Sequence, residues 1–200
     1  MRIIHFSDFH LDKSRLTPFN NIIYNLECAL KKIQEEHSID LILFTGDMLN
    51  QGGRSFEDIS DGFKTFKTIF IERLCKSINL APDRFIFTPG NHDVCRQKDS
   101  KALELGLSQI LVDIKSVAET IDSEDADNSI SRINDFKKFE KEYYSQLYEP
   151  ENYKYSKFCS NFKLIIDGHT IGISALNTAW RCWDSSKDKN NIWMGPAYCL

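Results

Sequence analysis

The sequence predicts an α/β fold, and two observations carry the prediction. Short apolar runs and segments with helical spacing alternate through the first half of the chain, in the order strand, helix, strand, helix, strand. That alternation favours neighbouring parallel strands joined by right-handed crossovers. A polar loop directly follows each predicted strand, and open α/β sheets place their ligands at these carboxyl ends.

The predicted strands are residues 2–6, 41–44 and 84–88, each a short apolar run bounded by polar residues. After the first strand, Thr17 and Pro18 predict a helix start, with Thr17 as the N-cap and Pro18 in the first turn. Apolar residues at helical spacing continue this helix to about His37. A second helix is predicted over residues 63–78, where the same spacing recurs.

Residues 97–150 predict a helical insertion or cap. Apolar spacing favours one helix over residues 103–121 and another over residues 131–148. Between them lies an acidic stretch that lacks the glycine and ligand pattern of a calcium loop, so we interpret it as a solvated loop; its acids are Glu119, Asp122, Glu124, Asp125 and Asp127. After the insertion, residues 162–176 predict a β-hairpin that turns at Asp167 and Gly168.

Composition excludes several classes of protein. With 42% hydrophobic and 27% charged residues, the chain of 200 residues is neither disordered nor a coiled coil. A net charge of −4 disfavours a strongly basic nucleic-acid module. No apolar run is long enough to span a membrane and the N-terminus does not resemble a signal peptide, so we expect a cytoplasmic protein without a membrane partner. Six widely spaced cysteines indicate free thiols.

Three polar motifs stand at the ends of the predicted strands; they are Asp8-x-His10, Gly46-Asp47 and Gly90-Asn91-His92-Asp93. Side chains two apart in extended backbone point the same way, so one metal ion can take both Asp8 and His10. The carboxylate of Asp47 can bridge two ions, and Asn91 can offer its amide oxygen. Oxygen ligands mixed with imidazole suit Mn, Fe, Zn or a similar divalent ion better than calcium.

Each short motif alone has a simpler interpretation. Asp-x-His is a weak signal, and Gly-Asp after a strand is more often a turn or a cap. Gly-Asn-His-Asp is more specific. Because all three occur in order, each after a strand of an α/β pattern, the sequence favours a metal centre.

These motifs resemble the first three signature motifs of the calcineurin-like metallophosphoesterase superfamily. The opening residues 3–8 and residues 174–180 are also similar to the family, whereas residues 97–160 carry no family motif. The resemblance implies a metallophosphoesterase-type two-sheet β-sandwich flanked by helices, in one domain over residues 1–200. The helical insertion at about 97–150 would interrupt it.

The resemblance also implies a role for each matching residue. Asp8 and His10 would hold the first of two metal ions, Asp47 would bridge them, and Asn91 would hold the second ion and contact phosphate. His92 would be the catalytic histidine that protonates or stabilises the leaving oxygen.

Two further roles follow from the same resemblance. Asp93 would hold a neighbouring imidazole in its working tautomer. Asn50 is a candidate for the Asp or Asn that the family often carries a few residues after the bridging aspartate.

The chain departs from the family in its late histidines. Family members complete both metal shells with histidines near the C-terminus, usually in Gly-His-x-His, but here Thr170 and Ile171 follow Gly168-His169. We interpret His5, His37 and His169 as structural. The sequence therefore looks like the first part of a longer phosphoesterase, truncated after Leu200.

The predicted function is metal-dependent hydrolysis of a phosphoester or phosphodiester by two divalent ions with a bridging hydroxide. Manganese is the preferred metal, with Fe, Zn and Ni as alternatives, and the substrate is a nucleotide, a nucleic acid or a phosphoprotein. The truncated chain would be weakly active or inactive. Two alternatives remain open: a non-catalytic binding or regulatory module on the same fold, and the N-terminal effector domain of a larger protein with further domains after Leu200.

Overall fold

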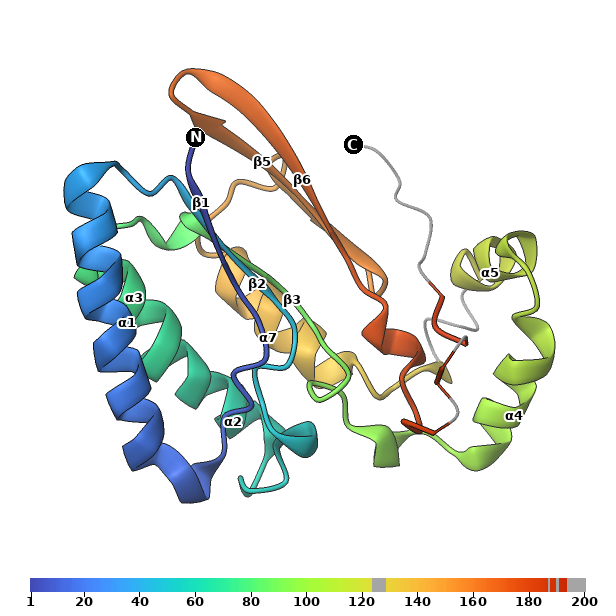
Figure 1. Ribbon diagram of the computed structural model, residues 1–200. Helices are drawn as coiled ribbons and strands as arrows, with labels where there is room; N and C mark the ends of the chain where they lie inside the picture. The colour runs from blue at the N-terminus through green and yellow to red at the C-terminus, as the bar shows by residue number, and fades with distance from the viewer. Residues whose placement is uncertain (124–128, 187, 190, 194–200) are drawn as a thin grey trace.

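The computed structural model describes residues 1–123, 129–186, 188–189 and 191–193, and it confirms a mixed α/β fold (Figure 1). Three parallel strands form the first sheet, in the order β1-β2-β3. Their bounds are Ile3–Phe6 for β1, Leu41–Thr45 for β2 and Phe85–Thr88 for β3. Phe6 pairs with Phe44, and Phe44 pairs with Phe87, so the three strands end at the same edge of the sheet.

The first sheet packs against helices α1 (Leu16–Glu36), α2 (Ile59–Phe66) and α3 (Glu72–Ser77). A π-helical turn, Lys67–Ile71, joins α2 to α3, so the predicted second helix is a continuous helical run. Phenylalanine rings fill the interface: the rings of Phe66 and Phe70 lie 5.1 and 5.4 Å from the ring of Phe44. No helix in the described part of the chain combines the length and the apolar character needed to cross a membrane.

The start of α1 differs from the prediction. Thr17 is not the N-cap, because the chain enters α1 from a 3-10 turn, Lys13–Arg15. Asp12 caps that turn, and its Oδ1 accepts a hydrogen bond of 2.9 Å from the Ser14 N–H. The carboxylate of Asp12 therefore does the capping that the sequence assigned to Thr17, and Pro18 lies within the first turn of α1.

The described residues of the segment 97–150 form helices in two separate parts. Helices α4 (Lys101–Ile110) and α5 (Ile114–Ile121) lie to one side of the molecule (Figure 1). The sequence predicted one helix here, and the structure breaks it because Asp113 and Ser116 form a capping box that starts α5. Glu124, Asp125 and Asp127 of the predicted acidic loop lie outside the described residues.

The other helix of this segment, α7 (Asn134–Tyr144), belongs to the core. The ring of Phe139 stacks on that of Phe63 in α2 at 5.1 Å. The hydroxyl of Tyr144 accepts a hydrogen bond of 2.9 Å from the Phe87 N–H and donates one of 3.2 Å to the Phe85 carbonyl oxygen. Helix α7 therefore supports β3 directly.

A buried ionic network joins α4 to the chain after β6. Arg132 is fully buried, and its guanidinium donates to Asp99, to Glu104 and to the carbonyl oxygen of Cys182. Arg181, also buried, makes a second ion pair with Glu104. The network holds three segments together that are far apart in the sequence.

The second sheet is antiparallel, in the order β4-β5-β6, and its strands are Tyr153–Tyr155, Cys159–Ile166 and His169–Leu176. The predicted hairpin between β5 and β6 is confirmed: Asp167 and Gly168 have φ of 50° and 77°, as a type I′ turn requires. Strand β4 was not predicted.

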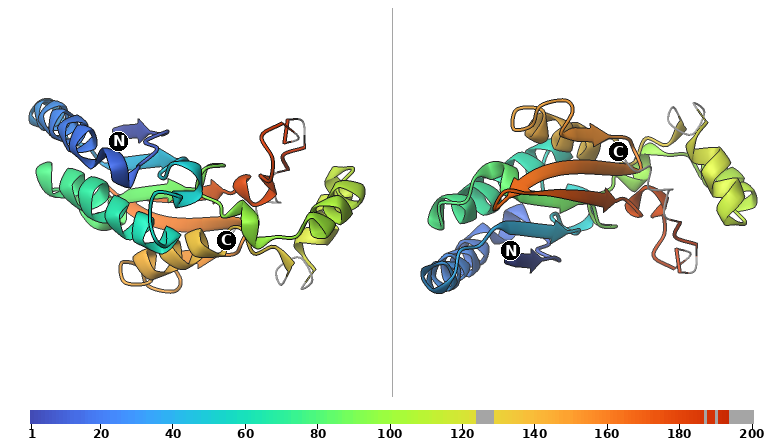
Figure 2. Two further views of the ribbon diagram at one scale, coloured as in Figure 1. Left: turned by 90° about the horizontal axis from the view of Figure 1, so that it is seen from below. Right: turned by 90° about the horizontal axis from the view of Figure 1, so that it is seen from above.

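The two sheets meet where β6 lies beside β3, and Figure 2 shows this neighbourhood from both sides. Thr88 Oγ1 donates a hydrogen bond of 3.0 Å to the Leu176 carbonyl oxygen, so the end of β6 lies beside the end of β3. The stacked sandwich and the truncation stay predictions. The described cysteines are unpaired, as predicted, and Cys199 lies outside the described residues.

Candidate metal centre

The loops after β1 and β2 run side by side and continue the pairing of the strands. The Asp8 N–H donates to the Gly46 carbonyl oxygen at 3.0 Å, and the His10 N–H donates to the Asp47 carbonyl oxygen at 2.9 Å. An isolated parallel bridge between Leu11 and Leu49 follows. Backbone hydrogen bonds alone therefore bring the first two motifs together.

Three residues of these motifs have left-handed backbone. Asp8, His10 and Asp47 have φ of 57°, 50° and 58°. Aspartate and histidine tolerate this conformation better than most residues with a side chain, but it still carries strain. Strained backbone of this kind concentrates at functional sites, where the surrounding structure holds it in place.

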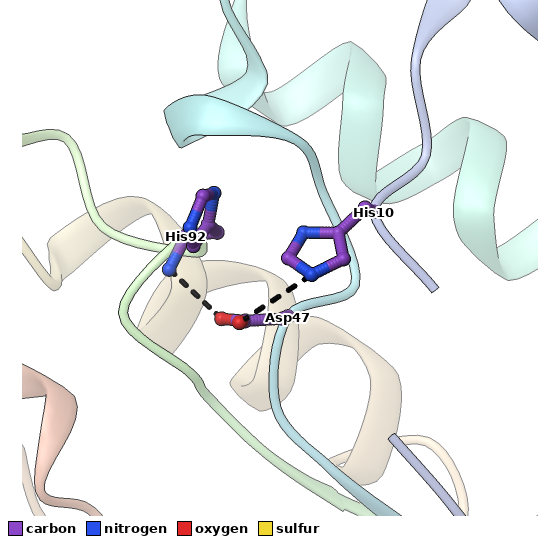
Figure 3. Close-up of side chains that lie close together, drawn as sticks. All are labelled: His10, Asp47 and His92. Carbon is purple, nitrogen blue, oxygen red and sulfur yellow. Dashed lines mark hydrogen bonds and ion pairs between the residues drawn. The ribbon is translucent and has the colours of Figure 1, made fainter. Parts of the chain in front are cut away.

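The side chains of His10, Asp47 and His92 converge, as Figure 3 shows. One potential ligand atom from each lies within 4.8 Å of the others. His10 Nε2 lies 3.8 Å from Asp47 Oδ2 and 3.8 Å from Asp8 Oδ1. In the described part of the chain, this is the one group of three His, Cys, Asp or Glu side chains with ligand atoms so close.

Asp47 lies at the junction of the three loops and is only 9% exposed. Its Oδ1 accepts a hydrogen bond of 2.9 Å from the His92 N–H, in the loop after β3. Its Oδ2 faces His10 from the loop after β1. Asp8, in contrast, is exposed and extends the group towards solvent.

The ring of His92 is held in one orientation. Its centroid lies 4.7 Å from that of His10, with the two ring planes at 81°. The Gln51 N–H donates a hydrogen bond of 3.1 Å to His92 Nδ1, which places the proton of the neutral ring on Nε2. Burial lowers the pKa of His92, while the carboxylate of Asp47 opposes that shift. The neutral ring therefore presents an Nε2–H donor.

Asp93 has a different role from the one that the resemblance implied. Its carboxylate is fully buried and accepts hydrogen bonds of 2.9 Å from the N–H groups of Leu49 and Gly90. Burial raises the pKa of Asp93 to about 7, while these N–H donors favour the charged form. Asp93 therefore ties the loop after β3 to the loop after β2, and it does not orient an imidazole.

The two asparagines of the prediction lie in different surroundings. The Asn50 side chain donates a hydrogen bond of 3.0 Å to Asp12 Oδ2, and it is bonded there instead of to the cluster. Asn91 lines a cavity of about 460 Å³ together with Asp47, Thr178 and Asp188. The structure therefore places Asn91, and not Asn50, beside the cluster.

Two histidines without a predicted site role lie elsewhere. His5 Nε2 is 2.6 Å from Thr45 Oγ1, within the sheet. His169 begins β6, whose last residue, Leu176, lies beside the end of β3. Seven residues of strand span about 23 Å, so His169 is too far from the cluster to be a ligand.

Sequence reasoning missed several residues that border the site. Thr178 and Asp188 line the cavity, and Arg54 and Arg96 line a second pocket beside His92. Thr178 and Asp188 follow no motif, because the fold alone brings the segment after β6 to this edge of the sheet. Arg96 had a weak signal, since it follows Asp93 by three positions.

The donor set fits a divalent transition metal. Carboxylate oxygens and imidazole nitrogens bind such ions at about 2.0–2.2 Å, so an ion fits between two ligand atoms that are 3.8 Å apart. The fold and the site thus define a mixed α/β protein with a candidate metal centre at the carboxyl ends of three parallel strands.

A family model, calcineurin-like phosphoesterase, matches residues 1–179, and the chain belongs to this family. Comparison with curated proteins and with solved structures found no match. Membership assigns the chain, at the level of the family, to the metal-dependent phosphoester hydrolases.

Proposed function

We propose that the protein hydrolyses a phosphoester or phosphodiester with two divalent metal ions, for which manganese is the preferred metal and Fe, Zn and Ni are alternatives. One observation carries the proposal. The buried carboxylate of Asp47 lies between His10 and His92, where the three loops meet.

Four side chains would hold the ions. Asp8 and His10 would bind the first ion, Asp47 would bridge through its two oxygens, and Asn91 would bind the second. When bound, the ions supply a nucleophile activated near neutral pH and positive charge for the phosphoryl oxygens. The backbone pairing of the loops after β1 and β2 supports this division, because it brings Asp8 and Asp47 each to 3.8 Å from His10 Nε2.

His92 would act on the leaving group. The hydrogen bond from Gln51 to Nδ1 leaves Nε2–H as a donor, and a nitrogen that carries a proton has no lone pair for a metal ion. The same bond therefore favours a catalytic role for His92 over a ligand role. Nε2–H can donate a hydrogen bond to the leaving oxygen of the substrate and stabilise the negative charge that develops there.

The substrate is proposed to be a nucleotide, a nucleic acid or a phosphoprotein, encountered in the cytoplasm. All three present a phosphoester to a site that opens beside Asp47 and Asn91.

The experiment compares metal content and hydrolysis in the wild type, Asp47→Ala and the control Asp61→Ala. Asp61 is an exposed carboxylate that pairs with Lys64 on the surface, so its loss should not affect the centre. We expect Asp47→Ala to lose bound Mn(II), measured by elemental analysis, and to lose hydrolysis of bis(p-nitrophenyl) phosphate. Equal metal content in all three proteins would refute the assignment. Metal binding by the wild type without turnover would favour the non-catalytic module.

A further inference from the structure

A basic pocket borders the candidate metal centre. Its volume is about 250 Å³, and Arg54, Arg96 and Ser185 line it together with Asn91 and His92. Among the described residues, no carboxylate lines this pocket. The chain as a whole has 29 acidic and 25 basic residues, so a pocket with two arginines and no acid is a local departure from its composition.

Arg96 is held in the pocket by neutral partners. Its Nη1 donates a hydrogen bond of 3.2 Å to Ser185 Oγ, and its Nη2 donates one of 3.4 Å to the Asn91 carbonyl oxygen. Neither bond compensates the positive charge. Within the described part of the chain, neither Arg96 nor Arg54 has a carboxylate within 4.0 Å.

Three other arginines behave differently. Arg132 and Arg181 pair with Glu104, and Arg73 pairs with Glu27. Arg96, which neutral partners hold in place, is suited to bind an external anion, because its planar group can donate two parallel hydrogen bonds to phosphate or carboxylate. Arg54 is exposed and lines the same pocket, so it can add a second positive charge there.

The size of the pocket limits what it can hold. Pockets for drug-sized ligands span about 300–1,000 Å³, so 250 Å³ suits one phosphate group of a larger molecule. The pocket is also distinct from the cavity beside Asp47. The two share Asn91 and Ser185, but Asp47 lines only the cavity and His92 lines only the pocket.

We propose that Arg54 and Arg96 bind a phosphate group of the substrate other than the one that is cleaved. The inference rests on the proposed function and narrows its substrate class: the preferred substrate carries a second phosphate adjacent to the scissile phosphoester. Nucleotides with two phosphates and nucleic-acid strands share that chemistry. His92 and Asn91 lie at the border between the two phosphate positions.

The first test measures binding without metal, so it does not depend on hydrolysis. Protein treated with a chelator is titrated with thymidine 3′,5′-bisphosphate by calorimetry. We expect the Arg54→Ala/Arg96→Ala double variant to bind it about tenfold or more weakly, as loss of charge-assisted hydrogen bonds predicts. The control is Arg15→Ala, which removes one exposed arginine outside the pocket. Absence of binding by the wild type, or equal binding by the double variant, would overturn the inference.

The second test uses hydrolysis with Mn(II) and two matched substrates. They are the p-nitrophenyl ester of thymidine 5′-phosphate with and without a 3′-phosphate. We expect the wild type to prefer the 3′-phosphorylated substrate, and the double variant to lose that preference through a lower kcat/KM on this substrate alone. An equal loss on both substrates would mean that the arginines serve the cleaved phosphate, and it would overturn the inference.

Two further results separate the possibilities. If the wild type binds the bisphosphate but hydrolyses neither substrate, the proposed function fails while the anion site stands. Tetrathymidylate in the binding titration identifies the source of the second phosphate: tighter binding than the bisphosphate indicates a nucleic-acid strand, and weaker binding indicates a nucleotide.

Discussion

Gly90 leaves open the space that the carboxylate of Asp47 occupies. A Cβ added to Gly90 would lie 2.1 Å from Asp47 Oδ1 and 2.4 Å from Asp47 N. Both distances are well below van der Waals contact. The φ of Gly90 is not positive, so its backbone conformation does not require a glycine. The close approach of the loop after β3 to the loop after β2 requires it instead.

We expect Gly90→Ala to displace the Asp47 carboxylate and to weaken metal binding by about 10–100-fold, as changes next to metal ligands typically do. Elemental analysis and calorimetry with Mn(II) measure the effect. Gly172→Ala is the matched control, since a Cβ there meets no atom within 4 Å. Retention of normal affinity in Gly90→Ala would show that Asp47 is not a ligand.

We expect His92→Asn to keep its metal ions and to lose about 10²–10³-fold in kcat, the usual cost of removing one positioned donor to a developing negative charge. The physical reason is the Gln51 N–H bond to Nδ1, which leaves Nε2–H free to donate. Parallel measurement of metal content and kcat on a purified variant is the check. Loss of metal from His92→Asn would instead make His92 a ligand, together with His10 and Asp47.

The network around Arg132 predicts a large cost for its removal. Arg132→Ala leaves the buried carboxylates of Asp99 and Glu104 without this cation, and breaking a buried pair in this way costs about 3–5 kcal/mol. Urea denaturation measures the free energy of unfolding. The control is Lys115→Ala, because the Lys115–Glu119 pair is exposed and worth about 0.5 kcal/mol or less. Similar losses in both variants would contradict the prediction.

The cap at Asp12 predicts a pH dependence. Hydrogen bonds, the strongest from Ser14 and the next from Asn50, lower the pKa of Asp12 to about 2 in the folded protein. In the unfolded chain the pKa of an aspartate is about 3.9. Because the folded pKa is the lower one, the carboxylate stabilises the fold above about pH 4, and this contribution is lost as the pH falls from about 4 towards 2.

Thermal unfolding of the wild type and Asp12→Ala at several pH values tests this dependence. We expect the wild type to have the higher Tm by an amount that is constant from neutral pH to about pH 5 and that shrinks below about pH 4. Asp12→Asn is the control, because its amide oxygen can still cap the turn but does not titrate. A difference between wild type and Asp12→Ala that persists unchanged to pH 3 would exclude the carboxylate as its source.

Patterns within short stretches of sequence were enough to predict the three parallel strands and the hairpin turn. The apolar runs around Ile4, Ile42 and Ile86 became the three parallel strands, and Asp167-Gly168 became the hairpin turn. The break before α5 also had a local signal in Asp113 and Ser116, which the apolar spacing outweighed. No local pattern could predict that α7 packs against β3, because that position depends on hydrogen bonds from Tyr144 to a strand that is distant in the sequence.

The site shows the same division. Asp8, His10 and Asp47 could be predicted as a group, because each follows a strand of one parallel sheet. The partners of Asp93 could not, since a carboxylate can accept equally well from an imidazole or from backbone N–H groups. Which of them it meets depends on the path of the loop after β3.

Hydrogen bonds within the polypeptide join the three loops. Backbone bonds link Asp8 to Gly46 and Gly52 to His92, and Asp93 adds the bond to Leu49. In a zinc finger the ion drives folding, so its removal unfolds the domain. Here the polypeptide itself assembles the ligands, so chelation and reloading should leave the scaffold intact. If the proposed centre binds metal, divalent ions of similar size would exchange while the protein stays folded, and the ion present in excess would occupy the site.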